Sequence, residues 1–120
     1  MKSALEATPE EREAEFEKGW DAGGFSFWLA NYQDMFFVDE ANKLCADYIR
    51  RKIRKTVIDQ AVADRLMPKG YHYGCKRQPF DINHYETFNK HNVKLVDAAT
   101  GGGIEEITDS WIPAFAEMTD

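Results

Sequence analysis

The residues best suited to chemistry are two adjacent cations, Lys76 and Arg77, which lie between Gly74 and Pro79. Flanking glycine and proline predict a loop, and loops on a rigid scaffold often carry binding and catalytic groups. A lysine offers a point charge, whereas an arginine offers a planar fork of donors that fits phosphate or peroxide oxygens. The pair therefore indicates a site for an anionic ligand. On these residues alone, a solvated pair of surface cations is the favoured alternative.

Histidines and cysteines near this loop allow two other kinds of site. His72 and Cys75 are close in sequence, but His84 and His91 follow at scattered positions. Zinc sites usually combine two compact ligand pairs, so a metal site is disfavoured. Cationic neighbours lower the pKa of a thiol, which makes Cys75 a candidate nucleophile with His72 as its base. Because no third group orients that base, nucleophilic catalysis is weakly supported.

The chain is long enough for one folded domain, and its composition disfavours several functions. It has 120 residues, of which 43% are hydrophobic and 13% aromatic, and a net charge of −6 that disfavours binding to nucleic acid. No segment is apolar enough for a membrane span or a secretion signal, and its two distant cysteines form no disulfide framework. A cytoplasmic setting is therefore expected. The glycines at 101–103 lack the spacing of a dinucleotide-binding turn.

Local signals in the first half predict helices. Thr8, Pro9 and Glu11 form a capping-box pattern that starts a helix ending at the glycine pair 23–24. Residues 1–7 are expected to fray, and residues 25–38 predict an aromatic helix with one apolar face. Asp39 is expected to cap the longest helix, whose apolar side chains recur at helical spacing as far as Val57.

The second half predicts shorter elements. Asp59 is expected to cap a helix ending at Leu66, and Asp81 one over residues 82–88. Residues 93–96 alternate in polarity and predict a strand, and residues 104–108 could form a second one. No structure is predicted for residues 109–120, which have no clear period.

Side chains on the predicted helices have simple structural interpretations. The aromatic residues of segment 25–38 are expected to form core, although they could instead line a pocket for an apolar substrate. Cys45 lies on the apolar stripe of the long helix and is expected to be a small buried hydrophobe. The basic cluster of the same helix is interpreted as a solvated face; it comprises Arg50, Arg51, Lys52, Arg54 and Lys55.

A longer pattern resembles a known family. The matching residues are Gly74-Cys75-Lys76-Arg77-Gln78-Pro79-Phe80-Asp81, Tyr85-Glu86-Thr87-Phe88-Asn89, Leu95-Val96-Asp97 and Ile104-Glu105-Glu106-Ile107-Thr108. Gly23-Gly24-Phe25, Leu66-Met67-Pro68 and the long helix add to the pattern. Together they resemble the flavin-dependent Baeyer–Villiger monooxygenases over residues 8–108. These enzymes use FAD, NADPH and dioxygen to convert ketones to esters or lactones.

The resemblance implies an α/β parent fold and roles for two residues. Arg77 would stabilise the negatively charged flavin peroxide, and Lys76 would contact the 2′-phosphate of NADPH. Residues 1–68 would be a helical insertion, and residues 69–108 would be a loop, short helix and strand of the Rossmann-like NADPH domain. Residues 109–120 match nothing expected of the family, which suggests an unrelated or out-of-frame tail.

Departures from the family limit what this chain is expected to do alone. Family members are several times longer and carry two glycine-rich motifs that are missing here, and His84 replaces a usual Tyr or Phe. We therefore expect an internal fragment that binds neither FAD nor NADPH stably, oxidises no ketone by itself and associates with missing monooxygenase domains, which a separate chain could supply. The alternatives are a helical interaction module that associates with itself or another protein, or an inactive remnant.

Overall fold

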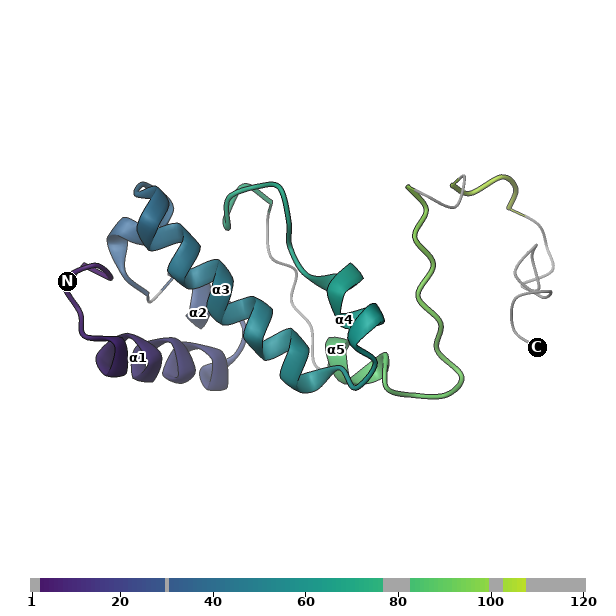
Figure 1. Cartoon of the computed structure of the whole chain (residues 1–120), viewed down its shortest axis with the longest axis horizontal. Helices are drawn as coiled ribbons and strands as arrows, with labels where there is room; N and C mark the ends of the chain where they lie inside the picture. Colours follow the sequence, from purple (N-terminus) through teal and green to yellow (C-terminus); the bar gives the residue numbers. More distant parts are fainter. Residues whose placement is uncertain (1–2, 30, 77–82, 100–102, 108–120) are drawn as a thin grey trace.

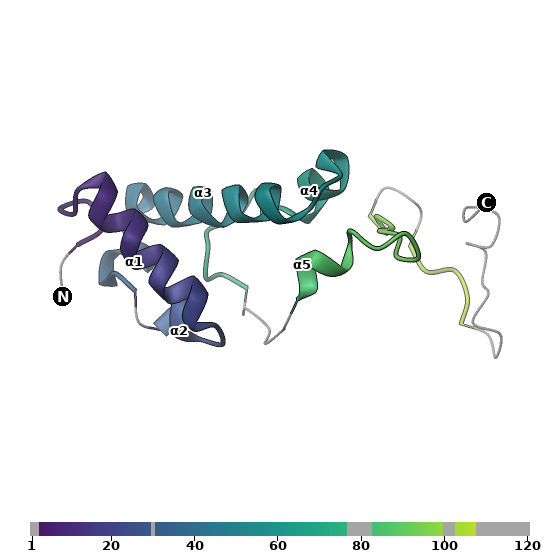
Figure 2. The ribbon, with the colours of Figure 1, turned by 90° about the horizontal axis from the view of Figure 1, so that it is seen from below.

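The described part of the chain is helical and is organised along one long helix. The computed structural model describes residues 3–29, 31–76, 83–99 and 103–107. Its elements are α1 (Pro9–Ala22), α2 (Ser26–Leu29), the 3-10 helix η1 (Gln33–Phe36), α3 (Asp39–Thr56), α4 (Gln60–Leu66) and α5 (His84–Thr87). Figures 1 and 2 show α1 and α2 beside the first part of α3, with α4 and α5 near its other end. Within the described residues, no helix is long and apolar enough to cross a membrane.

Helix α1 begins and ends as its sequence predicts. The Thr8 side chain accepts a hydrogen bond from the Glu11 N–H at 3.2 Å, and the Glu11 carboxylate accepts one from the Thr8 N–H at 3.1 Å. This reciprocal pair satisfies two N–H groups that a helix start leaves unpaired. At the other end Gly23 has a φ of 70°, which a residue without a Cβ adopts at little cost.

The core forms where α1, α2 and η1 meet the apolar face of α3. Tyr48 on α3 is 1% exposed, stacks on Phe27 at 5.6 Å between ring centroids and lies 5.2 Å from the Phe16 ring. Offset and tilted ring pairs of this kind add to the free energy of apolar burial. The main buried side chains are Phe16, Phe27, Tyr32, Met35, Cys45, Tyr48, Ile49, Ile53 and Val57. Phe27 and Tyr32 of the aromatic segment are therefore core, as predicted, and Phe36 packs against it, whereas Phe37 is exposed.

Ion pairs join the other face of α1 to α3. Arg51 donates to both oxygens of Glu13 at 2.9 and 3.0 Å, and Lys52 donates to Glu17 at 2.5 Å. The Tyr48 hydroxyl also donates to Glu17. The basic cluster of α3 is consequently not the wholly solvated face that the sequence suggested, because α1 brings carboxylates to it.

Three expectations for the first half were wrong. Residues 3–7 do not fray, since Asp34 accepts hydrogen bonds from the N–H of Ala4 at 2.9 Å and from the Ser3 hydroxyl. The aromatic segment is two short helices rather than one, because the Asn31 side chain bonds to the Tyr32 N–H at 2.9 Å and competes with helical pairing. Finally, α3 begins at Asp39 with no side-chain cap.

The second half contains less regular structure than predicted. The Asp59 side chain caps α4 as expected, accepting from the N–H groups of Ala61 and Val62. Helix α5 starts at His84 after Asn83, so its described part is shorter than the predicted 82–88; Asp81 lies outside the described residues. Residues 93–96 and 104–107 form no strand, because a strand requires a neighbour and the described residues offer none. The expected tail at 109–120 also lies outside the description.

The aromatic core predicts a large contrast between two phenylalanines. Replacing Phe16, which is 1% exposed, with alanine should lower the free energy of unfolding by about 3–5 kcal/mol or abolish the cooperative transition. Phe37, which is 87% exposed, serves as the control, and its replacement should change the value by about 0.5 kcal/mol or less. Urea denaturation followed by circular dichroism measures both. Equal midpoints for the two variants would contradict this core.

The ion pairs between α1 and α3 predict a dependence of stability on pH. Hydrogen bonds from Lys52 and then Tyr48 lower the pKa of Glu17 below its ordinary value of 4.5. A pKa depressed by folding means that the carboxylate stabilises the fold above pH 4.5, and that this contribution is lost as the pH falls through the folded-state pKa. Glu17→Gln should therefore be less stable than the wild type at pH 7.

Melting temperatures measured between pH 3 and pH 7 check this dependence. The difference between the Glu17→Gln variant and the wild type should shrink as the pH falls. Glu15→Gln, an exposed change on the same helix, is the control and should leave the curve unaltered. A constant difference between Glu17→Gln and the wild type at every pH would show that the charge of Glu17 contributes nothing.

Candidate functional site

The loop that leads to the cation pair is attached to α3 along its described length. It leaves α4 through the buried Met67, and the Pro68 carbonyl accepts a hydrogen bond from the Arg50 guanidinium at 3.1 Å. Lys69 pairs with Asp64 at 2.9 Å on the exposed side. The loop then returns along α3 towards η1, so it starts from a fixed point rather than from a free end.

A second attachment lies at Tyr73, next to the glycine that opens the cation motif. The buried Asn42 side chain of α3 bonds to both the N–H and the carbonyl of Tyr73, at 3.0 and 2.9 Å. The Tyr73 ring stacks on Phe36 of η1 with 6.1 Å between centroids. Gly74 follows with a φ of 96° and lies so close to Phe36 that a Cβ would be 2.8 Å from the ring. The backbone before Lys76 is therefore tightly seated.

Lys76 is presented at the surface. Its side chain is exposed, and its Nζ lies 4.5 Å from the centroid of the Tyr71 ring. A cation over an aromatic face is held by the quadrupole of the ring while its other donors remain available to an anion. Arg77, the predicted catalytic residue, lies outside the described residues.

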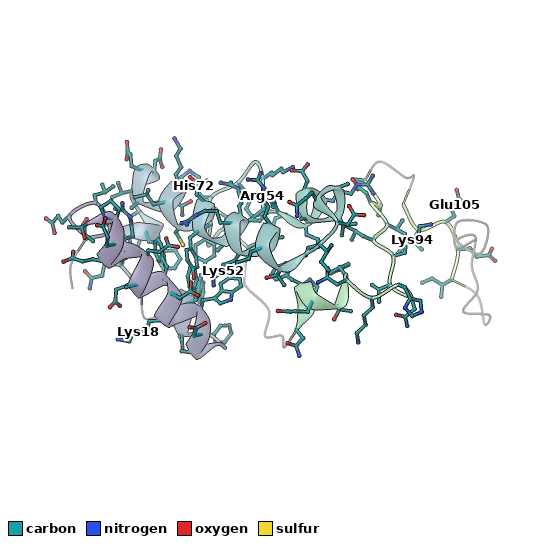
Figure 3. All side chains as sticks on the ribbon, turned by 60° about the horizontal axis from the view of Figure 1, so that its bottom comes forward. Lys18, Lys52, Arg54, His72, Lys94 and Glu105 are labelled. Atoms are coloured by element: carbon teal, nitrogen blue, oxygen red, sulfur yellow. The ribbon has the colours of Figure 1, made fainter. Side chains whose placement is uncertain are left out.

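The described contacts of His72 and Cys75 are with groups of α3 and of the loop itself. Within residues 3–29, 31–76, 83–99 and 103–107, no three His, Cys, Asp or Glu side chains gather as metal ligands. The Nε2 of His72 lies 3.5 Å from a carboxylate oxygen of Asp39. The backbone carbonyl of His72 accepts a hydrogen bond from the Cys75 N–H. Figure 3 shows His72 near α3, while Lys94 and Glu105 lie far from it towards the C-terminal end.

His84 packs as an aromatic residue. Its ring lies 5.1 Å from Tyr85 and 5.4 Å from Phe88, in edge-to-face arrangements. The exposed His84 ring therefore packs on two aromatic neighbours at α5. This substitution is compatible with the local packing of α5.

An open apolar groove lies beside the core, where the sequence allowed a pocket. It measures about 680 Å³, and its walls include Trp28, Leu29, Phe36 and Phe37. Leu29 is 69% exposed, and the buried Trp28 indole N–H has no hydrogen-bond partner in the part of the chain that the structure describes. Segment 25–38 thus supplies both core and the wall of a groove.

The chain is similar in sequence and in structure to proteins of known function. No family model matches the chain. Cyclopentanone 1,2-monooxygenase of Comamonas sp. is 44% identical over 98 residues, which are 80% of this chain and 18% of that protein. Cyclohexanone 1,2-monooxygenase of Acinetobacter sp. is 38% identical over 110 residues, which are 91% of this chain and 20% of that protein.

Solved structures agree with the sequence matches. The structure of OTEMO in complex with FAD and NADP superposes with a TM-score of 0.79 at 38% identity, covering 82% of this chain and 18% of that one. Oxidized steroid monooxygenase bound to NADP gives a TM-score of 0.78 at 42% identity, covering 82% and 19%. The helical arrangement and the sequence thus define a segment of a flavin monooxygenase.

The chain belongs to the Baeyer–Villiger monooxygenase family. It spans about one fifth of the length of the curated relatives that it matches. Its relatives include FAD-binding proteins and structures that contain NADP, and the fold of the solved neighbours is α/β. The described part of this chain is a helical portion of that fold.

The two cysteines should react very differently with thiol reagents. Burial raises the pKa of Cys45 to about 12, whereas Cys75 is exposed. At pH 8 a maleimide should modify Cys75 quickly and Cys45 only on unfolding. The reagent cannot reach the buried Cys45, and little of that thiol is in the reactive thiolate form. Mass spectrometry of the peptides reads out both sites, with Cys75→Ser as the control for assignment. Fast modification of Cys45 in the folded chain would contradict its place in the core.

Proposed function

We propose that this chain is the segment of a Baeyer–Villiger monooxygenase that presents two cations to NADPH and FAD. The whole protein would use these cofactors and dioxygen to convert ketones to esters or lactones. The supporting observation is the exposed Lys76 at the end of a loop held on α3 by Asn42 and on η1 by Phe36. A solvated surface pair would need no such attachment of its backbone.

The chemistry of the pair fits the two proposed roles. Lys76, with its exposed ammonium group, would bind the 2′-phosphate of NADPH as a compact point charge. Arg77 would be the catalytic cation and would hold negative charge beside the flavin, since a guanidinium stays protonated and offers several fixed donors. FAD, when bound by the whole protein, would supply the oxygen-transfer chemistry.

The rest of the monooxygenase is the partner that this chain would need. We assign residues 1–68 to the helical insertion and residues 69–108 to the NADPH-binding domain. Residues 93–96 would pair with strands of that domain's sheet, which would satisfy backbone groups that pair with no strand in the described residues. The same partner would cover Leu29 and Phe37, which are 69% and 87% exposed.

The exposed apolar residues also favour a second candidate function, a helical module that associates with copies of itself. A defined oligomer in sedimentation would favour the module over the monooxygenase segment.

We further propose a cytoplasmic setting, because both Cys45 and Cys75 are free thiols, which persist in reducing compartments.

A chimera tests the proposed function. Residues 8–107 replace the matching segment of the Comamonas cyclopentanone monooxygenase, and ester formation and NADPH oxidation are measured. The chimera should form ester, and the 120-residue chain mixed with FAD, NADPH and ketone should form none. In the chimera, Lys76→Ala should raise KM for NADPH roughly 10- to 100-fold, the loss expected for one charge-assisted hydrogen bond. KM for NADH should change little.

Lys69 provides a matched control for Lys76. It begins the same loop, is exposed and pairs with Asp64, so Lys69→Ala removes a charge without touching the proposed phosphate site. Arg77→Ala should abolish ester formation while cofactor binding persists. Equal effects of the two lysine changes on KM for NADPH would refute the role of Lys76, and ester formation by the Arg77→Ala chimera would refute that of Arg77.

A further inference from the structure

Asn42 has contacts that helix formation does not explain. It lies in the second turn of α3, where asparagine has a low helix propensity because its amide competes for backbone hydrogen bonds. The residue is 4% exposed, and its burial would be costly without partners for the amide. The side chain makes three bonds: Nδ2 donates to the carbonyls of Met35 and Tyr73, each at 2.9 Å, and Oδ1 accepts from the Tyr73 N–H at 3.0 Å.

These three bonds require an amide. Two carbonyl acceptors need a donor, and one backbone N–H needs an acceptor, so the orientation of the group follows from its partners. A leucine of similar size could satisfy none of the three, and an aspartate would set an oxygen against two carbonyls. The Asn42 amide therefore joins α3, the end of η1 and the loop at a single buried point.

The loop carries a matching feature on its own side. Gly74 sits against the Phe36 ring with a φ of 96°, and a Cβ at this position would be 2.8 Å from two ring atoms. The Phe36 ring in turn stacks on Tyr73. Gly70 has a similar φ of 76°, but nothing lies within 4 Å of the Cβ that a side chain would add. The close approach thus distinguishes Gly74 from the other glycine of the loop.

We propose that Asn42 and Gly74 are positioning residues that fix where residues 73–76 of the loop lie relative to α3. Lys76 follows Gly74 by two positions, so a shift of the Tyr73 backbone carries the ammonium with it. The value of this device for catalysis rests on the proposed function of Lys76 and Arg77. The positioning itself is a property of the described chain and can be tested on it alone.

Cys75 offers a local probe for the test. A nitroxide attached to the exposed Cys75 of the 120-residue chain reports loop mobility, while the buried Cys45 stays unlabelled. Asn42→Leu should narrow the spectral lines and raise the hydrogen-exchange rate of the Tyr73 amide about tenfold or more. Asn31→Leu is the control, because Asn31 is also buried and hydrogen-bonded but contacts Phe27 and Tyr32 rather than the loop. Its spectrum should match that of the wild type.

A second pair of variants tests the device if Asn42→Leu does not fold. Gly74→Ala should mobilise the label, whereas Gly70→Ala carries a similar backbone strain without the clash and should not. The proposal would be overturned if the label became equally mobile in Asn42→Leu and Asn31→Leu, and equally mobile in Gly74→Ala and Gly70→Ala. The changes would then act through general stability. Failure of the proposed function shows separately: Lys76→Ala would leave the chimera's KM for NADPH unchanged while the label still responds to Asn42 and Gly74.

Discussion

Burial of one face of α3 is the constraint on which the other described elements depend. Tyr48, in the middle of that face, contacts the rings of Phe16 from α1 and Phe27 from α2. Short helices such as α2 and η1 are not stable alone, because few of their backbone hydrogen bonds are internal. Packing against α3 compensates for this, and ion pairs on the opposite side of α1 fix its direction. Packed in this way, η1 and α3 form the surface to which the loop attaches at Tyr73.

Local signals predicted α1 and α4 because their start sites are contained in a few neighbouring residues. Thr8 with Glu11, and Asp59 with the N–H groups after it, form the same bonds that the sequence suggests. The break within residues 25–38 could not be found by periodicity, because it depends on the side chain of Asn31 bonding to its neighbours. Residues 3–7 are held in place by hydrogen bonds to Asp34, about thirty positions further along the chain, and no local pattern reveals such a contact.

The sequence suggests a chemistry for the candidate site but does not reveal the contacts that hold its loop. Two adjacent cations between glycine and proline indicate an anion site by residue type alone, and the family resemblance assigned roles to Lys76 and Arg77. Asn42 was missed because its partner Tyr73 lies 31 positions further along the chain. An asparagine inside a strongly amphipathic helix, on the side of its buried residues, was the one signal that the sequence contained. Weak helix formers at buried helical positions therefore merit attention as anchors for distant loops.

Contacts within this chain position the loop, whereas other described groups of the chain have no partner strand or cover. The attachment of the loop is internal, since residues of α2, η1 and α3 contact Tyr73 or Gly74. The backbone of residues 93–96 pairs with no strand in the described residues, and Leu29 and Phe37 face solvent. The backbone before Lys76 is thus positioned by contacts within this chain, which would lower the cost of organising charge if the proposed cofactors bind there. Under the proposed function, the oxygen chemistry would come from the cofactors of the whole protein, and this segment would contribute the positive charges of Lys76 and Arg77.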